Sequence, residues 1–211
     1  MGLPSLLRQG LSGIAAILLN RTAAEVGGDA AVSAISLVSR LFLLVFSVCL
    51  GISQGMLPVV GYNLGADRQK RVRESYRFAL QASTLAMLTI GILLFLSAPQ
   101  VLSLFQSEGE GIEIGVTALR AQSLVLFSHG IVTPTIFFLQ ACGRSYLASL
   151  LASARQGIFF LPLILLLPLS RGLLGVELAQ PIADAATLLF SIPFVILILR
   201  TFRRGNARIE R

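Results

Sequence analysis

The chain has 211 residues, of which 55% are hydrophobic and only 13% are charged, and its formal net charge is +7. A soluble domain carries about 25% charged residues, so a water-soluble fold of this composition would expose large apolar patches. Basic residues flank apolar segments without interleaved aromatic residues, which excludes a nucleic-acid surface. Cys49 and Cys142 lie inside apolar runs, so we expect neither a disulfide framework nor a metal site.

Six apolar segments have the length of a membrane span, which requires about 20 residues of helix. In chain order they are 3–24, 31–57, 78–98, 118–141, 147–169 and 178–199. The segments lack the alternating pattern of a membrane barrel, and helices satisfy their own backbone hydrogen bonds in lipid. The sequence therefore predicts an all-α polytopic membrane protein, a single six-helix bundle over residues 1–211 with a basic tail at 200–211.

The basic residues predict which side of the membrane each loop faces. With the N-terminus in the cytoplasm, the inner side receives every Lys and Arg except Arg21, Arg40, Arg120 and Arg171. An excess of Lys and Arg in short cytoplasmic loops directs insertion. We therefore expect a multi-pass protein of the cytoplasmic membrane with both termini in the cytoplasm.

The second span ends in a glycine-rich stretch that runs directly into a basic loop, "GISQGMLPVVGYNLGADRQKRV" at 51–72. Gly51 and Gly55 form a G-x-x-x-G pair, which favours close packing against another helix. Glycines and Pro58 also permit a broken backbone inside a bundle. The basic residues that follow are expected to meet anionic lipid headgroups at the cytoplasmic surface.

Several polar residues inside the spans are candidates for an ion or substrate pathway. Arg40 lies nine residues into the second span, and we expect it to pair with Asp184 because buried charges are seldom left single. Gln54 and Gln140, near inner helix ends, can hydrogen-bond across helices or to a substrate. His129 either relays protons, since its ordinary pKa is about 6.5, or stays neutral and hydrogen-bonded. We expect a helix kink five residues after it, at Pro134.

Asp184 is the only acid well inside a predicted span. An ionisable group at the centre of a membrane helix costs about 2.5–3.5 kcal/mol on insertion scales, so its presence indicates an ion or substrate pathway. If the last helix begins at Pro181, however, Asp184 lies in its first turn, where the helix dipole favours an anion. Both interpretations remain open at this point.

The stretch at 51–72 resembles the signature of the MATE (multidrug and toxic compound extrusion) transporters. Further similar segments occur in the same order: "LPSLLRQGL" at 3–11, "FFLQACGRS" at 137–145, "SARQGIFFLPL" at 153–163 and "GVELAQPIAD" at 175–184. MATE transporters have twelve spans in two related six-helix lobes, and the resemblance is to the second, C-terminal lobe. It implies either a fragment or a half-sized protein that needs a partner lobe or a second copy.

The resemblance also implies a function, namely secondary active efflux of drugs or organic cations, coupled to protons or sodium ions. Some family members place coupling carboxylates on the helices that match spans 3–24 and 118–141. Neither span contains an internal Asp or Glu here, so the resemblance implies a lobe without a clear ion site of its own. No cofactor other than a coupling H⁺ or Na⁺ is expected.

Two alternatives differ in class from drug efflux. A flippase-like relative would move lipid-linked anionic substrates, which the basic inner surface permits. A polytopic membrane enzyme would require paired acids, a nucleophile with its base, or a metal cluster at membrane depth. One Asp and one distant His do not supply such a set, so we expect no catalytic residues.

Overall fold

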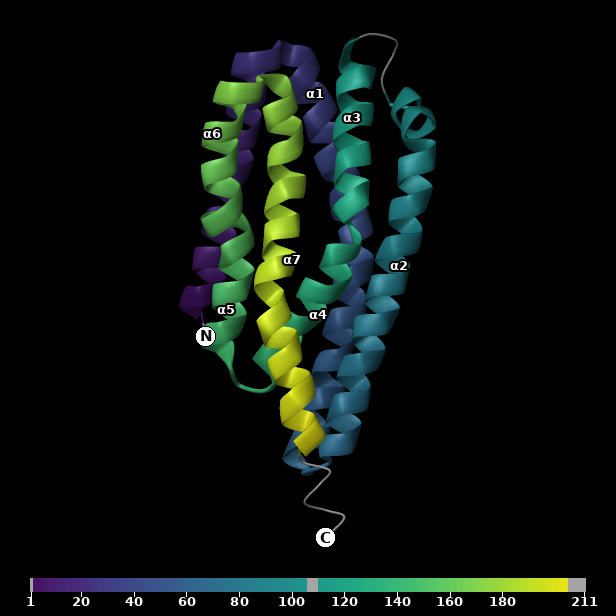
Figure 1. The fold of residues 1–211 in the computed structure, drawn as a ribbon, viewed down its shortest axis with the longest axis vertical. Coiled ribbons are helices and arrows are strands. Elements are labelled where there is room, and N and C mark those ends of the chain that lie inside the picture. The colour runs from purple at the N-terminus through teal and green to yellow at the C-terminus, as the bar shows by residue number, and fades with distance from the viewer. Residues whose placement is uncertain (1, 106–109, 205–211) are drawn as a thin grey trace.

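The computed structural model describes residues 2–105 and 110–204, and all the regular elements in these ranges are helical. The prediction of an all-α fold is confirmed. The elements are α1 (Gly2–Gly65), α2 (Gln69–Ser103), α3 (Glu110–Val125), α4 (Phe127–Ala141), α5 (Ser145–Ser153), the π-helix η1 (Ala154–Phe160), α6 (Leu161–Arg171) and α7 (Leu173–Arg204). Figure 1 shows them gathered into one elongated bundle.

Helix α1 is broken at Gly28 into two arms that run in opposite directions (Figure 1). A straight helix of 64 residues would be about 96 Å long, far more than the ~30 Å core of a bilayer. Gly28 has φ 63° and ψ −158°, a backbone conformation that is essentially restricted to glycine. The first arm, 2–27, therefore leads to one end of the bundle, and the second arm, 29–65, returns from it.

Within the described ranges, four helical stretches are long and apolar enough to cross a membrane, and a fifth span results if α3 and α4 count as one bent span. The break at Gly28 divides the first of these stretches into two arms, each long enough to cross a membrane. The helices extend beyond several of the predicted segments. Most notably, α7 begins at Leu173 instead of 178 or Pro181, and it continues to Arg204, into the predicted tail.

The span formed by α3 and α4 bends by 53° at Leu126. Helix α4 continues through Pro134, so the kink expected at that proline stays a prediction, and the bend at Leu126 lies eight residues before it. Gly130, just beyond the bend, lies against the backbone of α2. A Cβ added to Gly130 would lie 2.4 Å from Thr84 Cα and 2.7 Å from the Ser83 carbonyl oxygen. This close approach fixes the start of α4 against α2.

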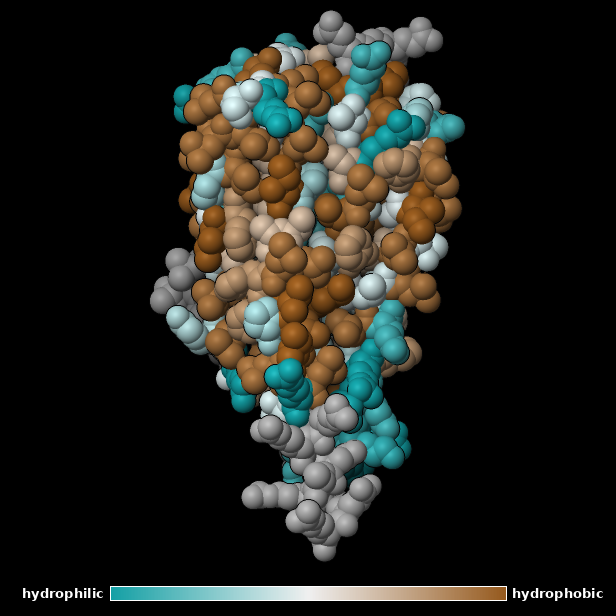
Figure 2. Space-filling model, viewed as in Figure 1, coloured by the Kyte–Doolittle hydropathy of each residue, from teal (hydrophilic) through white to brown (hydrophobic). Residues whose placement is uncertain are grey.

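Apolar side chains form both the core and much of the outer surface. One core cluster joins α1 to η1, α6 and α7 around Phe160 and Ile164, and another joins α1, α2, α4 and α7 around Tyr76 and Phe138. In the view of Figure 2 the flank of the bundle is mostly hydrophobic, and hydrophilic side chains gather towards its two ends. Such a surface suits the lipid core in the middle and the interfaces at the ends.

The glycines at the end of α1 do not serve close packing among the described residues, contrary to one interpretation of the sequence. A Cβ added to Gly51, Gly55, Gly61 or Gly65 would meet no atom within 4 Å. The α1 backbone also remains helical through Pro58 to Gly65, so the stretch is not re-entrant. Gly51 and Gly55 instead line a hollow of about 730 Å³ between α1 and α2, together with Arg68 and Arg71.

Candidate functional site

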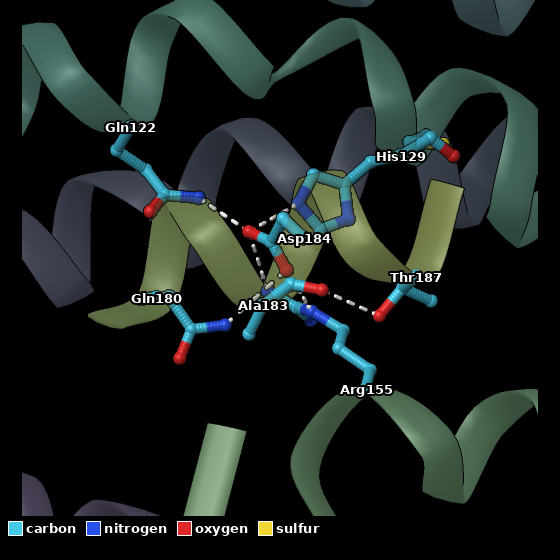
Figure 3. Close-up of polar contacts among 8 residues, drawn as sticks. Gln122, His129, Arg155, Gln180, Ala183, Asp184 and Thr187 are labelled. Carbon is cyan, nitrogen blue, oxygen red and sulfur yellow. Dashed lines mark hydrogen bonds and ion pairs between the residues drawn. The ribbon is translucent and has the colours of Figure 1, made fainter. Parts of the chain in front are cut away.

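A buried cluster of polar side chains surrounds Asp184, in the interior of α7 (Figure 3). Arg155 Nε donates a hydrogen bond to Asp184 Oδ1 over 2.6 Å, and Gln122 Nε2 donates to Oδ2 over 2.7 Å. His129 Nε2 lies 3.1 Å from Oδ2, and Gln180 Nε2 donates to Oδ1 over 3.3 Å. An ionised carboxylate only accepts hydrogen bonds, so the Nε2 atom of His129 carries the hydrogen in this arrangement.

The arrangement neutralises a negative charge that is removed from solvent. The Asp184 side chain is 0% exposed and that of Arg155 is 18% exposed. A lone buried charge is very costly. The fold therefore tolerates a buried carboxylate only if an ion-pair partner and hydrogen bonds neutralise it. The Asp184 cluster, defined as Asp184 with Gln122, His129, Arg155 and Gln180, meets both requirements.

Aromatic rings of α1 cover the positive side of the cluster. The guanidinium carbon of Arg155 lies 5.4 Å from the ring centre of Phe42 and 5.9 Å from that of Phe46. The same two rings contact His129 edge-on, with centroid distances of 5.0 and 5.4 Å. Aromatic faces attract cations, so these rings hold Arg155 and His129 in position beside Asp184.

Three helical spans contribute the cluster, and two of them are irregular close to it. Gln122 and His129 lie on either side of the bend at Leu126, so one span contributes two groups to one carboxylate. Arg155 belongs to the π-helix η1, an irregularity that is often found at functional sites. Pro162 follows closely, and its ring clashes with the carbonyl four residues earlier in a regular helix. On α7, Gln180 and Asp184 are one turn apart and share a face.

A pocket of about 380 Å³ lies next to the cluster, inside the bundle. Its polar wall includes Gln122, Arg155, Gln156, Glu177 and Gln180. Its apolar wall comes from both arms of α1, from α3, from η1 and from α7, and includes Leu19, Ile35, Val38, Phe42, Phe46, Phe160 and Val176. The pocket is therefore mostly apolar with a few converging polar groups, as is usual for small-molecule sites.

The structure brings two of the predicted residues together and leaves three apart. Asp184 and His129 are in contact, whereas Arg40, Gln54 and Gln140 are exposed on the surface of the bundle. The expected pair between Arg40 and Asp184 is wrong, because Arg155 occupies that position. The interpretation of Asp184 as a first-turn residue is also wrong, since α7 begins eleven residues earlier, at Leu173.

Sequence reasoning missed several members of the site. Arg155 and the glutamines were not recognised because a uniformly apolar helix does not reveal which of its faces points inward. Glu177 was missed because the last span was expected to begin at residue 178. A start at Leu173 places this acid inside the helix, seven residues before Asp184 and on a similar face. Among the described residues, no group of three or more His, Cys, Asp or Glu side chains is placed to hold a metal ion.

Comparison with known sequences identifies the family. The MatE family model matches residues 4–166 of this chain. The multidrug export protein MepA of Staphylococcus saprophyticus is 22% identical over 198 residues, which cover 94% of this chain and 43% of MepA. The probable multidrug resistance protein NorM of Streptococcus pneumoniae is 30% identical over 139 residues, 65% of this chain and 28% of NorM. The chain thus spans less than half the length of these relatives.

Solved structures show that the fold of this chain, too, corresponds to about half of a larger transporter. An outward-facing multidrug resistance MATE family transporter of the MOP superfamily superimposes with a TM-score of 0.84 at 22% identity, over 96% of this chain and 46% of that one. The Vibrio cholerae MATE transporter VcmN in its bent form gives a TM-score of 0.84 at 25% identity, over 94% and 45% of the two chains. This chain therefore belongs to the MATE family of membrane transporters and has the fold of one half of such a transporter.

Proposed function

We propose that this chain forms the second lobe of a secondary active antiporter that exports drugs or organic cations across the cytoplasmic membrane. Proton or sodium entry drives the export, and both termini lie in the cytoplasm. The observation that carries the proposal is the neutralised Asp184 cluster beside a pocket of about 380 Å³, inside a bundle that has the fold of half a MATE transporter.

The pocket has the size and lining of a small-molecule site. Ligand pockets commonly measure about 300–1,000 Å³ and are mainly hydrophobic, with a few polar groups that set the orientation of the ligand. The Phe42, Phe46 and Phe160 rings line this pocket and suit a flat amphipathic molecule. The Asp184 cluster forms part of its wall through Gln122, Arg155 and Gln180, so the geometry of the pocket depends on the cluster.

A polar face on α1 supports the presence of a partner lobe. Arg40, Ser47 and Gln54 are exposed on the second arm of α1, and their spacings of seven and fourteen residues place them within about 40° of one another around the helix. Polar and charged side chains that face lipid are costly, whereas a water-filled path between two lobes accommodates them. Gly51 and Gly55, also exposed, continue this face towards the end of α1.

Transport then follows from the relative motion of the two lobes. Rocking of one lobe against the other exposes a central path alternately to each side of the membrane. One lobe supplies only one wall of such a path. We therefore expect that the 211-residue chain exports substrate only when a second lobe accompanies it, whether that lobe is a related first lobe or a second copy of this chain.

The test is export of ethidium from a drug-sensitive, efflux-deficient bacterial host. The chain is expressed alone and together with the first lobe of a MATE relative, and the molecular mass of the purified assembly is measured. We expect background export from the lone chain and restored export from the pair. Export by a strictly monomeric chain would contradict the proposal, whereas export by a stable dimer of the chain would identify the second copy as the partner.

A further inference from the structure

Glu177 is a buried acid whose charge has no partner among the described residues. The residue is only 6% exposed, and among the described residues its Oε2 atom has no hydrogen-bond partner. The carboxamide oxygen of Gln156 is buried and unpartnered in the same way. Both residues line the pocket beside the Asp184 cluster, one from α7 and the other from η1.

The nearby cation is already engaged with the other acid. Arg155 contacts both carboxylate oxygens of Asp184, over 2.6 Å to Oδ1 and 3.4 Å to Oδ2, and its opposite side faces the Phe42 and Phe46 rings. Within the part of the chain that the structure describes, Glu177 forms no ion pair with a protein cation. The two acids therefore differ in role, because Asp184 is neutralised within the protein and Glu177 is not.

An unpaired carboxylate removed from water is strongly unfavourable until a proton or a cation neutralises it. Two oxygen acceptors without donors attract a positively charged group that donates hydrogen bonds or makes direct electrostatic contact. The space beside them is about 380 Å³, many times the volume of a bare ion, and apolar side chains form most of its remaining wall. This combination fits an organic cation with an apolar body.

We propose that Glu177 and Gln156 bind the cationic group of a drug-sized organic cation in this pocket, while the Phe160, Ile35 and Val176 side chains contact its apolar part. This inference rests on the proposed export function and adds the residues that recognise the substrate. It also assigns a positioning role to Asp184, which holds Arg155 away from Glu177 and so leaves the second carboxylate free for the ligand.

The experiment uses the chain assembled with a first lobe, purified in detergent, and ethidium as the organic cation. Its dissociation constant is measured by fluorescence titration, and the thermal unfolding midpoint is recorded with and without ethidium. Glu177→Gln removes the charge and keeps the shape. Glu113→Gln is the matched control, because Glu113 is an exposed acid of α3 that does not line the pocket. A neutral amphiphile of similar size serves as the control ligand.

We expect Glu177→Gln to weaken ethidium binding by about 10- to 100-fold, as for the loss of one hydrogen bond to a charged group, and to leave the neutral ligand unaffected. Without ligand, the variant should unfold at the same or a higher temperature than the parent, because an unpaired buried charge has been removed. With ethidium, the stabilisation seen in the parent should disappear. Gln156→Leu should weaken binding in the same direction, and Glu113→Gln should bind as the parent does.

Three other outcomes overturn the inference, and they differ in what they say of the export function. If Glu177→Gln binds and exports ethidium normally, the cation is recognised elsewhere and the export function stands. The same holds if the variant loses only sodium binding, measured with ²²Na⁺, because Glu177 would then be a coupling-ion ligand. If the parent assembly neither binds nor exports ethidium or another organic cation, the proposed export function fails and the inference fails with it.

Discussion

Asp184 and Arg155 form a buried ion pair whose two charges depend on each other. Their side chains are 0% and 18% exposed, and loss of one partner from a buried pair costs about 3–5 kcal/mol because the other charge is left uncompensated. We expect Asp184→Asn and Arg155→Gln each to lower the thermal unfolding midpoint and to abolish most export. The double variant, which removes both charges, should be more stable than the sum of the single losses predicts.

The exposed ion pair between Arg21 and Glu25 provides the matched control for this cycle. Its side chains are 74% and 59% exposed, and such pairs contribute about 0–1 kcal/mol, so Glu25→Gln should change the midpoint very little. Additive effects of Asp184→Asn and Arg155→Gln would show that the two residues do not act as a pair. Full export by Asp184→Asn would remove Asp184 from the transport machinery.

Gly130 is a residue at which a single added carbon should disrupt the site. A Cβ there would lie 2.4 Å from Thr84 Cα and 2.6 Å from Thr84 N, and backbone atoms cannot move aside as a flexible side chain can. We expect Gly130→Ala to lower thermal stability and export together, since it displaces the helix turn that carries His129. Gly51→Ala, whose Cβ would meet nothing within 4 Å, should leave stability unchanged or raise it. Equal stability of the two variants would contradict the close approach of α4 to α2.

The sequence predicted which residues are unusual better than it predicted their partners. Asp184 and His129 stand out because ionisable groups are rare in apolar segments. Arg155, by contrast, was counted only among the basic residues of the cytoplasmic side, where long arginines can reach out of the lipid. Its true direction depends on the π geometry of η1. The composition of a segment does not encode the rotation of the helix about its axis.

At the scale of elements, the break in α1 depends on one residue. Gly28 has φ 63° and ψ −158°, where any other residue is strained by about 1–3 kcal/mol. We expect Gly28→Ala to destabilise the bundle and to reduce the yield of folded protein, measured by size-exclusion chromatography. Gly13 lies in the regular part of the first arm, and a Cβ added there would meet no atom within 4 Å. Gly13→Ala should therefore be tolerated and serves as the control. A normal yield from Gly28→Ala would mean that the two arms can be joined in another conformation.

The positions of the spans were predictable from apolar length, and their interruptions were not. The predicted segment 118–141 contains the bend at Leu126 without any glycine or proline at that residue. The bend is associated instead with the tight contact of Gly130 against α2, which is a tertiary feature. Helix ends were displaced outward for a related reason, since polar residues such as Gln69 and Glu177 extend helices beyond the apolar core that hydropathy detects.

At the scale of the whole molecule, we expect the loop charges to set the orientation in the membrane. Helix α1 starts and α7 ends towards one end of the bundle, and the Gly28 break and the turn between α6 and α7 lie towards the other (Figure 1). We expect reporter fusions at Gly109 and at the C-terminus to lie on opposite sides, with the C-terminus inside. The excess of basic residues in the loop after α1 favours a cytoplasmic location for that loop, so replacing them by glutamine should make the orientation less uniform. The residues to replace are Arg68, Lys70, Arg71 and Arg73. Fusions that report the same side would rule out six crossings.

The polar face of α1 should contact water in the assembled transporter, unlike the outer face of α2. Gln54 is exposed on the face that also carries Arg40, whereas Leu85 of α2 is 67% exposed within the stretch 78–98, which contains no charged residue. A cysteine reacts with maleimide as its thiolate, which forms in water and not in hydrocarbon.

With both native cysteines replaced by alanine, we therefore expect Gln54→Cys to be labelled by a membrane-impermeant maleimide in the chain assembled with a first lobe. Leu85→Cys should remain unlabelled. Labelling is followed by the shift in mass of the purified chain. If neither cysteine reacts, the α1 face lies in lipid or in a dry interface, and the central path must be sought on another helix.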